Sequence, residues 1–276
     1  MAYLELSYAL PVDEDLSEIF IARLYELGFD SFSQEDTILK AYVHEKDFDA
    51  ESLKSILNEP EFSEVRLLTH ESLAEQNWNA LWESNYQAVI INNKCRIRAP
   101  FHAADPAFEF DLLIEPKMSF GTAHHETTSQ MLAMMLTLEF KNKSTLDMGS
   151  GTAVLAILAR KKGAYPVVAV DNDEWAFNNA LDNIKLNDTN DIKVVLGDAK
   201  DIGNQMFDIV IANINRNILL QDMPFYTAAL APNGLLMMSG FYEADLPLIQ
   251  AKARELDMIY VRHTSVNQWV AVLFSK

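Results

Sequence analysis

The chain has 276 residues, of which 49% are hydrophobic and 22% charged, and its formal net charge is -18. This length and composition allow a hydrophobic core, exclude a disordered or fibrous protein, and fit one large domain or two. The excess of 40 acidic over 22 basic side chains disfavours a protein that grips nucleic acid through phosphates. It favours a basic protein partner, although solubility alone also explains it.

A single cysteine, Cys95, excludes an internal disulfide and favours a reducing compartment. Residues 1–15 carry four acidic side chains and no basic segment before an apolar run, so they do not resemble a signal peptide. No apolar stretch is long enough to cross a bilayer. We therefore expect a cytoplasmic protein without membrane contact. We also expect a monomer that has no stable nucleic-acid binding and no metal site.

The hydrophobic pattern of residues 1–70 predicts a small domain of its own. Strands are predicted at 3–10, 29–33, 37–43 and 64–69, and helices at 16–27 and 48–57. The order βαββαβ indicates a ferredoxin-like α+β sandwich. His44 and His70 have no partner at metal-ligand spacing and no catalytic cluster is present, so we expect this domain to recognise a partner.

Residues 71–86 predict a helix that connects this domain to a second one over residues 87–276. Trp78, Leu81 and Trp82 fall on one side of the helix at i, i+3 and i+4. Such a row usually packs against a neighbouring domain, and a hinge between the domains is the functional alternative.

A strand, a tight turn, a helix and a second strand are predicted over residues 144–171. The turn contains Gly149 and Gly151, and Asp171 ends the second strand. Glycines at such a turn let a ligand approach the backbone, and an acidic side chain after the next strand can accept the hydroxyls of a ribose. The pattern predicts a site for an adenosine-containing cofactor, although turn geometry alone would also require glycines.

A dinucleotide and S-adenosylmethionine compete for this site. A dinucleotide fingerprint requires a third glycine where the chain has Val154, and it lacks the acidic residue that Asp147 supplies before the turn. The order Asp147, Gly149, Gly151 and a small Ala153 resembles the first motif of class I methyltransferases. A cationic sulfonium also suits an acidic turn better than a pyrophosphate does.

A second unusual stretch precedes this turn. A glycine-containing loop leads to His124 and His125, and Thr127 and Thr128 follow near the start of an apolar helix. Adjacent side chains point in different directions, so the two histidines are poor metal co-ligands. We expect this region to cap the helix.

The remaining chain continues the alternation of helices and strands. Helices are predicted at 175–187, 218–231 and 244–255, and strands at 193–196, 207–213, 234–239, 258–264 and 269–274. Asp198 and Asn213 each follow or end a strand, where ligands bind in α/β sheets; capping of a turn is the alternative for Asp198. The last two strands predict an antiparallel hairpin. We expect a Rossmann-like α/β domain with a seven-stranded sheet and one reversed strand.

Four segments together resemble one known family: residues 115–128, 146–153, 211–214 and 239–240. Over nearly its whole length the chain is similar to the bacterial class I methyltransferases that modify lysines and the N-terminal amine of large-subunit ribosomal protein L11. The Phe-Gly-Thr loop at 120–122 is the specific part of this likeness, because many enzymes share the glycine motif.

The resemblance implies that S-adenosylmethionine is the cofactor and that ribosomal protein L11 is the substrate, bound by the domain at 1–70. The cofactor-binding residues that it implies, as contacts or near neighbours, are Thr128, Gly149, Gly151, Asp171, Asn213, Gly121 and Asp198. Asn213 and Phe120 are expected to form the slot for the acceptor amine.

Two departures from the family pattern are Ala123 and Ala153, which stand where members usually have glycine and add a methyl group near the ligand backbone. The run Asn213-Ile-Asn-Arg lacks the prolines of the Asn-Pro-Pro-Tyr motif, which argues against glutamine and adenine as substrates. The alternatives are a class I methyltransferase for another protein or a small amine, and a non-catalytic module that binds S-adenosylmethionine.

Overall fold

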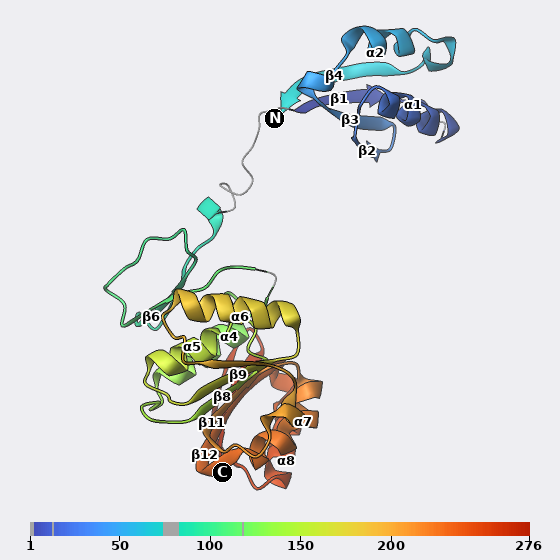
Figure 1. The fold of residues 1–276 in the computed structure, drawn as a ribbon. Coiled ribbons are helices and arrows are strands. Elements are labelled where there is room, and N and C mark those ends of the chain that lie inside the picture. Colours follow the sequence, from blue (N-terminus) through green and yellow to red (C-terminus); the bar gives the residue numbers. More distant parts are fainter. Residues whose placement is uncertain (1–2, 13, 74–82, 118) are drawn as a thin grey trace. The chain divides into compact units, whose positions relative to one another are not determined.

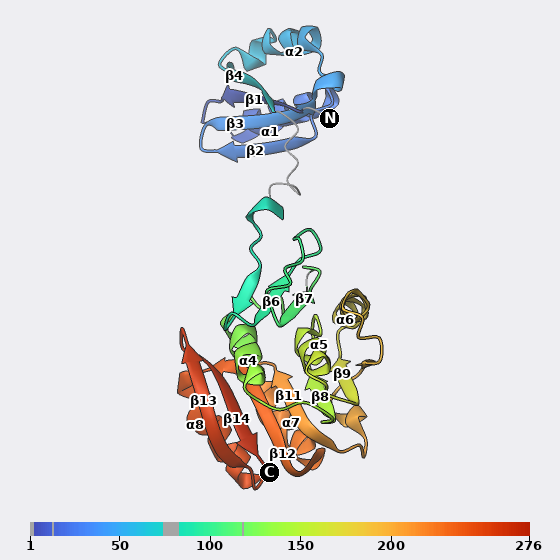
Figure 2. The ribbon, with the colours of Figure 1, turned by 90° about the vertical axis from the view of Figure 1, so that its left-hand side faces the viewer.

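The computed structural model describes residues 3–12, 14–73, 83–117 and 119–276. The chain divides into two units, residues 1–86 and 87–276, and each unit has its own hydrophobic core. Figures 1 and 2 show the two units, which are described separately below.

The first unit is a four-stranded antiparallel sheet with two helices on one face. Its elements are β1 (Tyr3–Ala9), α1 (Glu14–Glu26), β2 (Ser31–Glu35), β3 (Ile38–His44), α2 (Ala50–Leu57) and β4 (Arg66–Leu73), with short 3-10 turns at Glu45–Asp47 and Pro60–Phe62. The strand order is β2-β3-β1-β4, so each βαβ crossover leaves room for a third strand between the two that it joins. The predicted ferredoxin-like topology is confirmed.

The sheet of the first unit buries only one face. Leu4, Leu6 and Tyr8 alternate along β1 and are buried in one cluster with residues of α1 and α2. Glu5 lies on the other face, where its carboxylate pairs with Lys40 at 3.0 Å. Among the described residues of the unit, both helices lie on the Leu4 side of the sheet and none covers the Glu5 side.

The predicted start of a helix at residue 71 is wrong. Glu71–Leu73 continue β4, because they pair with β1 as far as the Tyr3–Leu73 register and so satisfy their backbone groups in the sheet. Residues 74–82, which include Trp78, Leu81 and Trp82, lie outside the described residues. The connecting helix therefore stays a prediction.

The second unit begins with a small sheet and continues as a βα alternation. The small sheet contains β5 (Val89–Ile91), β6 (Cys95–Arg98) and β7 (Phe110–Leu113). The helices that follow are α4 (Glu126–Leu136), α5 (Val154–Lys161), α6 (Glu174–Leu186), α7 (Arg216–Ala228) and α8 (Leu246–Glu255), with 3-10 turns at Ala199–Ile202 and Glu243–Asp245. The strands are β8 (Thr145–Met148), β9 (Val167–Asp171), β10 (Lys193–Leu196), β11 (Phe207–Asn213), β12 (Leu230–Tyr242), β13 (Ile259–Val266) and β14 (Trp269–Ser275).

The large sheet has seven strands in the order β10-β9-β8-β11-β12-β14-β13. The first five are parallel to one another, and β14 runs antiparallel to both of its neighbours. Figure 2 shows β13 and β14 (red) at one edge of this sheet. The predicted Rossmann-like sheet, ending in a hairpin with one reversed strand, is confirmed.

Helices cover both faces of the large sheet. Strand side chains alternate between two clusters: Ile209 and Ile211 of β11 pack with residues of α4, α5 and α6, while Val210 and Ala212 pack with residues of α7 and α8. Figure 1 shows these two helical layers on opposite sides of the strands. No helix among the described residues is long and apolar enough to cross a membrane.

Strand β12 is longer than the predicted strand at 234–239. Its register with β14 shifts between Ser239 and Phe241, and Gly240 between them has φ +101°. A Cβ at Gly240 would overlap the backbone of Ile214, so only glycine lets the two chain segments come this close. This bulge shapes the turn that follows β11.

Candidate functional site

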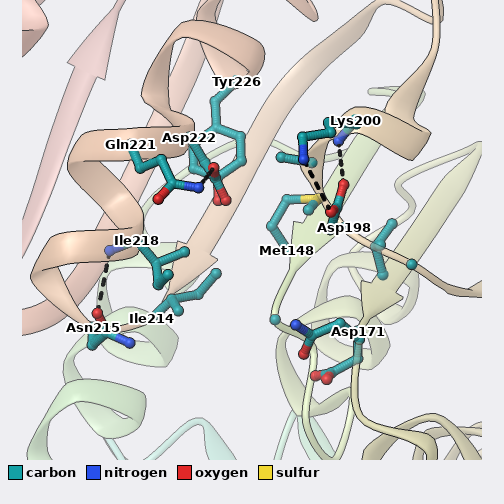
Figure 3. Close-up of a pocket in the computed structure, with 15 residues that line it drawn as sticks. Met148, Asp171, Asp198, Lys200, Ile214, Asn215, Ile218, Gln221, Asp222 and Tyr226 are labelled. Carbon is teal, nitrogen blue, oxygen red and sulfur yellow. Dashed lines mark hydrogen bonds and ion pairs between the residues drawn. The ribbon is translucent and has the colours of Figure 1, made fainter.

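A cavity of about 410 Å³ opens beyond the carboxyl ends of β8, β9 and β10 (Figure 3). This is the edge where open α/β sheets bind ligands, because the turns after parallel strands meet there. Three of the predicted residues, Gly149, Asp171 and Asp198, line the cavity. The other lining residues are Met148, Val170, Asn172, Gly197, Ala199, Lys200, Ile214, Asn215, Ile218, Gln221, Asp222 and Tyr226.

The glycine turn after β8 is held against its neighbours on both sides. The Gly151 N–H donates to Asp171 Oδ2 at 2.8 Å. Gly151 has φ +53°, and a Cβ there would overlap the carbonyl oxygen of Phe120. A Cβ on Gly149 would come within 2.7 Å of the Ile214 side chain. The turn thus joins the ends of β8, β9 and β11 with the Phe120 loop.

Asp147, the acidic residue before this turn, links the end of β8 to the start of α5. Its side chain is only 1% exposed, and Oδ2 accepts the N–H of Ala156 in the first turn of α5 at 3.0 Å. Ala153, at the N-cap position, has no side chain that can do this. Burial raises the pKa of Asp147 to about 7, and its Oδ1 has no hydrogen-bond partner.

Both predicted nucleoside contacts already accept backbone N–H groups. Asp171 Oδ1 accepts the N–H of Asp173 at 3.0 Å in addition to the bond that Oδ2 makes with Gly151. A carboxylate has about four acceptor sites, so it can still accept from a ribose. Asp198 Oδ1 accepts the N–H of Lys200 at 2.7 Å and caps the 3-10 turn in a reciprocal pair with Asp201. The alternative role of Asp198 as a cap is therefore present.

The loop around Phe120 lies against the turn, outside the residues that line the cavity. The N–H of Thr152 donates to the Phe120 carbonyl at 3.0 Å, and its hydroxyl donates to the Gly121 carbonyl at 2.7 Å. The Phe120 side chain is 53% exposed. Its backbone is thus fixed while its ring is available for contact.

Four rings follow one another at this place and are here called the aromatic row. The ring centroids of Phe120 and His125 are 5.2 Å apart, those of His125 and Trp269 are 4.7 Å apart, and those of Trp269 and Tyr242 are 4.1 Å apart. The row joins the Phe120 loop, the start of α4 and the β12–β14 pair. Such rings offer an apolar face to a side chain that lies against them.

Asn213 and Thr128, two predicted contacts far apart in sequence, meet at the end of β11. The Asn213 amide group donates from Nδ2 to Thr128 Oγ1 at 3.2 Å. Asn213 Oδ1 is buried and has no hydrogen-bond partner. The bond to Thr128 fixes the orientation of the amide, so an acceptor oxygen is left for a further donor.

The two histidines cap and anchor the helix start, as predicted. His125 Nδ1 accepts the N–H of Thr127 at 3.2 Å, so in a neutral ring the proton is on Nε2. His124 Nε2 lies 3.0 Å from the carbonyl of Gln87, and its Nδ1 lies 3.2 Å from Thr122 Oγ1. Neither ring is arranged as a general base in this geometry. Within the described residues, no group of three or more His, Cys, Asp or Glu side chains has the arrangement of a metal site.

The wall of the cavity formed by α7 was missed in the sequence. Ile218, Asp222 and Tyr226 are spaced four residues apart and share one side of the helix. The start of this helix just after Asn213 was a usable signal, but the pattern did not show which of its faces meets the cavity.

Comparisons with known proteins identify the family of the chain. The sequence profile of the family described as "Ribosomal protein L11 methyltransferase (PrmA)" matches residues 14–276. A ribosomal protein L11 methyltransferase of Phocaeicola vulgatus is 44% identical, with 99% of each chain covered. One from Bacteroides thetaiotaomicron is 42% identical over 100% of both chains. The crystal structure of a ribosomal protein L11 methylase from Lactobacillus delbrueckii subsp. bulgaricus matches with a TM-score of 0.65 and 25% identity, covering 69% of this chain and 99% of that chain. The chain belongs to the ribosomal protein L11 methyltransferase family.

Proposed function

We propose that the protein transfers methyl groups from S-adenosylmethionine to lysine and N-terminal amino groups of large-subunit ribosomal protein L11. The family relationship supports this reaction, because the relatives that match over the full chain carry that name. We further propose that it acts as a cytoplasmic monomer, and that the first unit binds the ribosomal protein.

The composition of the cavity favours an adenosyl sulfonium over a dinucleotide. Three carboxylates, those of Asp171, Asp198 and Asp222, line it together with one basic side chain, Lys200. A pyrophosphate would be repelled by these charges, whereas a sulfonium cation would be attracted. The cavity volume of about 410 Å³ lies within the usual range for small-ligand pockets.

The observation that carries the proposal is the orphaned acceptor of Asn213. Its Oδ1 is buried without a partner, and the bond from Nδ2 to Thr128 at 3.2 Å holds it in place. An incoming amine brings N–H donors, so this oxygen would hold the amine with its lone pair directed toward the methyl donor. Orientation of this kind is the main contribution that a protein can make to a displacement at carbon.

Bound S-adenosylmethionine would supply an electrophilic methyl group: the C–S bond breaks with its electrons kept by sulfur, and the amine lone pair forms the new N–C bond. A lysine with an ordinary pKa of about 10.4 must lose a proton first. The aromatic row would exclude water from the lysine side chain. Because an apolar slot disfavours the ammonium form, this desolvation would lower the pKa of the lysine. No dedicated base is needed if the proton leaves to solvent.

The test is transfer of labelled methyl from S-adenosylmethionine to purified ribosomal protein L11. We expect the wild type to label L11 and Asn213→Ala to lower kcat by about 100-fold, since one lost orienting group typically costs this much. Asn178→Ala is the matched control, because this exposed amide on α6 donates to the Glu174 carbonyl of its own helix and does not line the cavity. An Asn213→Ala enzyme with wild-type rate and unchanged cofactor affinity would contradict the site.

A lysate experiment separates the alternative substrates. Incubation with labelled S-adenosylmethionine should label one ribosomal protein, and mass spectrometry of ribosomal proteins from cells with and without the chain should show methylated L11 only in its presence. A labelled protein of another size, or a labelled small amine, would indicate a different acceptor. Cofactor binding by calorimetry without any labelled acceptor would indicate a non-catalytic module.

A further inference from the structure

The α7 wall of the cavity contains a buried hydroxyl group without a partner. Tyr226 is 0% exposed, and its hydroxyl makes no hydrogen bond although the residue lines the cavity. Burial raises the pKa of the Tyr226 hydroxyl above the ordinary tyrosine value, so the hydroxyl remains a hydrogen-bond donor at any working pH. A buried polar group that is left unpaired is costly, and its persistence beside a cavity indicates a ligand that pairs with it.

Asp222 lies one turn earlier on the same side of α7. Its Oδ1 accepts the side-chain N–H of Gln221 at 3.3 Å, and burial raises the pKa of its carboxyl. The carboxyl is close enough to Tyr226 to influence that hydroxyl, without forming a hydrogen bond of standard geometry. Figure 3 shows both residues across the cavity from Asp198 and Lys200. An acceptor and a donor therefore lie side by side at one end of the cavity.

Part of the cavity wall is apolar, which suits contact with a flat aromatic ring. The apolar side chains that line the cavity include Met148, Val170, Ile214 and Ile218. Asp198, a predicted cofactor contact, accepts the Lys200 N–H with Oδ1, and its Oδ2 lies 3.9 Å from the Lys200 ammonium. Adenine presents an amino donor next to a ring-nitrogen acceptor, which is the complement of a carboxylate next to a hydroxyl donor.

We propose that Asp222 and Tyr226 read the hydrogen-bonding edge of the cofactor's adenine. Asp222 accepts from the exocyclic amino group, and the Tyr226 hydroxyl donates to the neighbouring ring nitrogen. The identity of the ligand rests on the proposed function. The two residues then select the adenine base, whereas Asp171 holds the ribose.

Calorimetric titration tests this without any methyl transfer. The probes are S-adenosylhomocysteine and S-inosylhomocysteine, in which a 6-oxo group replaces the amino donor. We expect the wild type to prefer the adenine ligand by about tenfold or more, since a site built for a donor rejects the analogue that lacks it. Asp222→Asn should weaken the adenine ligand by about tenfold and narrow the preference, because the amide can donate to the 6-oxo group.

Tyr226→Phe removes only the hydroxyl and should weaken S-adenosylhomocysteine several-fold. Tyr8→Phe is its matched control: Tyr8 is also 0% exposed with an unpartnered hydroxyl, but it lies in the core of the first unit. This control should leave the Kd unchanged. If the wild type binds S-adenosylhomocysteine and both cavity variants match its Kd, the adenine assignment is overturned and the proposed function stands. If the wild type binds neither ligand, the proposed function falls with it.

Discussion

The two units of the molecule differ in where their charge lies. Residues 1–86 contain 19 acidic and 5 basic side chains, a net charge of -14, whereas residues 87–276 contain 21 and 17, a net charge of -4. The net charge of the whole chain is therefore the sum of a strongly acidic unit and a nearly balanced one. An inference about a basic partner applies to the first unit, and the cavity belongs to the second.

The few cations of the first unit do little to offset its acidity. Arg23 pairs with Glu59 at 2.6 Å and with Glu26 at 3.2 Å, and Lys40 pairs with Glu5 at 3.0 Å. Outside these pairs the unit still has 16 carboxylates and only 3 cations. Such a unit attracts a basic protein over distances of about a Debye length, while the second unit supplies the short-range geometry of a site.

The largest effect on ligand binding is expected from backbone geometry in the second unit. In Gly151→Ala the new Cβ overlaps the Phe120 carbonyl at a residue with φ +53°. We expect about 100-fold weaker binding of S-adenosylhomocysteine and a lower Tm. Gly28→Ala is the matched variant in the first unit: φ is +90°, but nothing lies within 4 Å of the new atom. It should cost about 1 kcal/mol without changing the Kd. Equal loss of ligand affinity in both variants would contradict this distinction.

The largest effect on the pH dependence of stability compares two carboxylates, each of which accepts a hydrogen bond from the first turn of a helix. Burial raises the pKa of Asp147 to about 7, whereas hydrogen bonds from Ser52 lower the pKa of the exposed Asp49 at the start of α2. Asp147 therefore contributes stability that is complete below pH ~4 and is lost as the pH rises to about 7. The difference corresponds to on the order of 4 kcal/mol. Asp49 contributes stability that is lost as the pH falls through its native pKa.

Urea denaturation between pH 3 and 8 measures both contributions. Relative to wild type, Asp147→Asn should gain stability as the pH rises, because the amide needs no ionisation and its oxygen still accepts the Ala156 N–H. Asp49→Asn should instead lose stability relative to wild type as the pH rises. If the stability of both variants relative to wild type changed in the same direction with pH, the opposite pH dependences expected for Asp147 and Asp49 would be refuted.

The charge difference itself predicts a smaller, salt-dependent effect. Glu18, Glu61 and Glu64 are exposed in the first unit, and their joint replacement by Gln should lower kcat/KM for L11 by about threefold to tenfold at low salt, through KM. The difference should vanish at about 1 M salt, where screening is nearly complete. The control replaces Glu109, Glu139 and Glu255, which are exposed in the second unit. If both triple variants lose the same activity, net charge alone is responsible and the first unit has no special role.

The spacing of hydrophobic residues along the chain was enough to predict most of the fold. The alternation of Leu4, Leu6 and Tyr8, and the unbroken apolar run that ends at Asn213, marked a one-sided strand and a strand buried on both faces. Strand ends were less predictable, because they depend on pairing: β4 continues to Leu73 only because β1 offers it partners that far.

Only some of the residues that line the cavity could be predicted from the sequence. Gly149 and Asp171 follow strands, and a parallel sheet must bring such positions to one edge. Asp222 and Tyr226 lie inside a helix whose rotation about its axis is set by tertiary packing, so no local pattern showed that they face the ligand space. The role of Asp198 as a cap depended on Asp201, a residue the pattern did not single out.

The smallest effect concerns Ala153, which has φ +62° and is wholly buried. Ala153→Gly relieves left-handed strain of about 1–2 kcal/mol, while the added freedom of the unfolded chain offsets about 0.5–1 kcal/mol of that gain. A net stabilisation of about 0.5–1 kcal/mol should appear in urea denaturation. Ala156→Gly, three residues later and inside α5, should destabilise by about 1 kcal/mol because its φ is helical. These substitutions differ in sign only if the backbone at 153 is strained, so destabilisation by both would show that Ala153 fits its turn without strain.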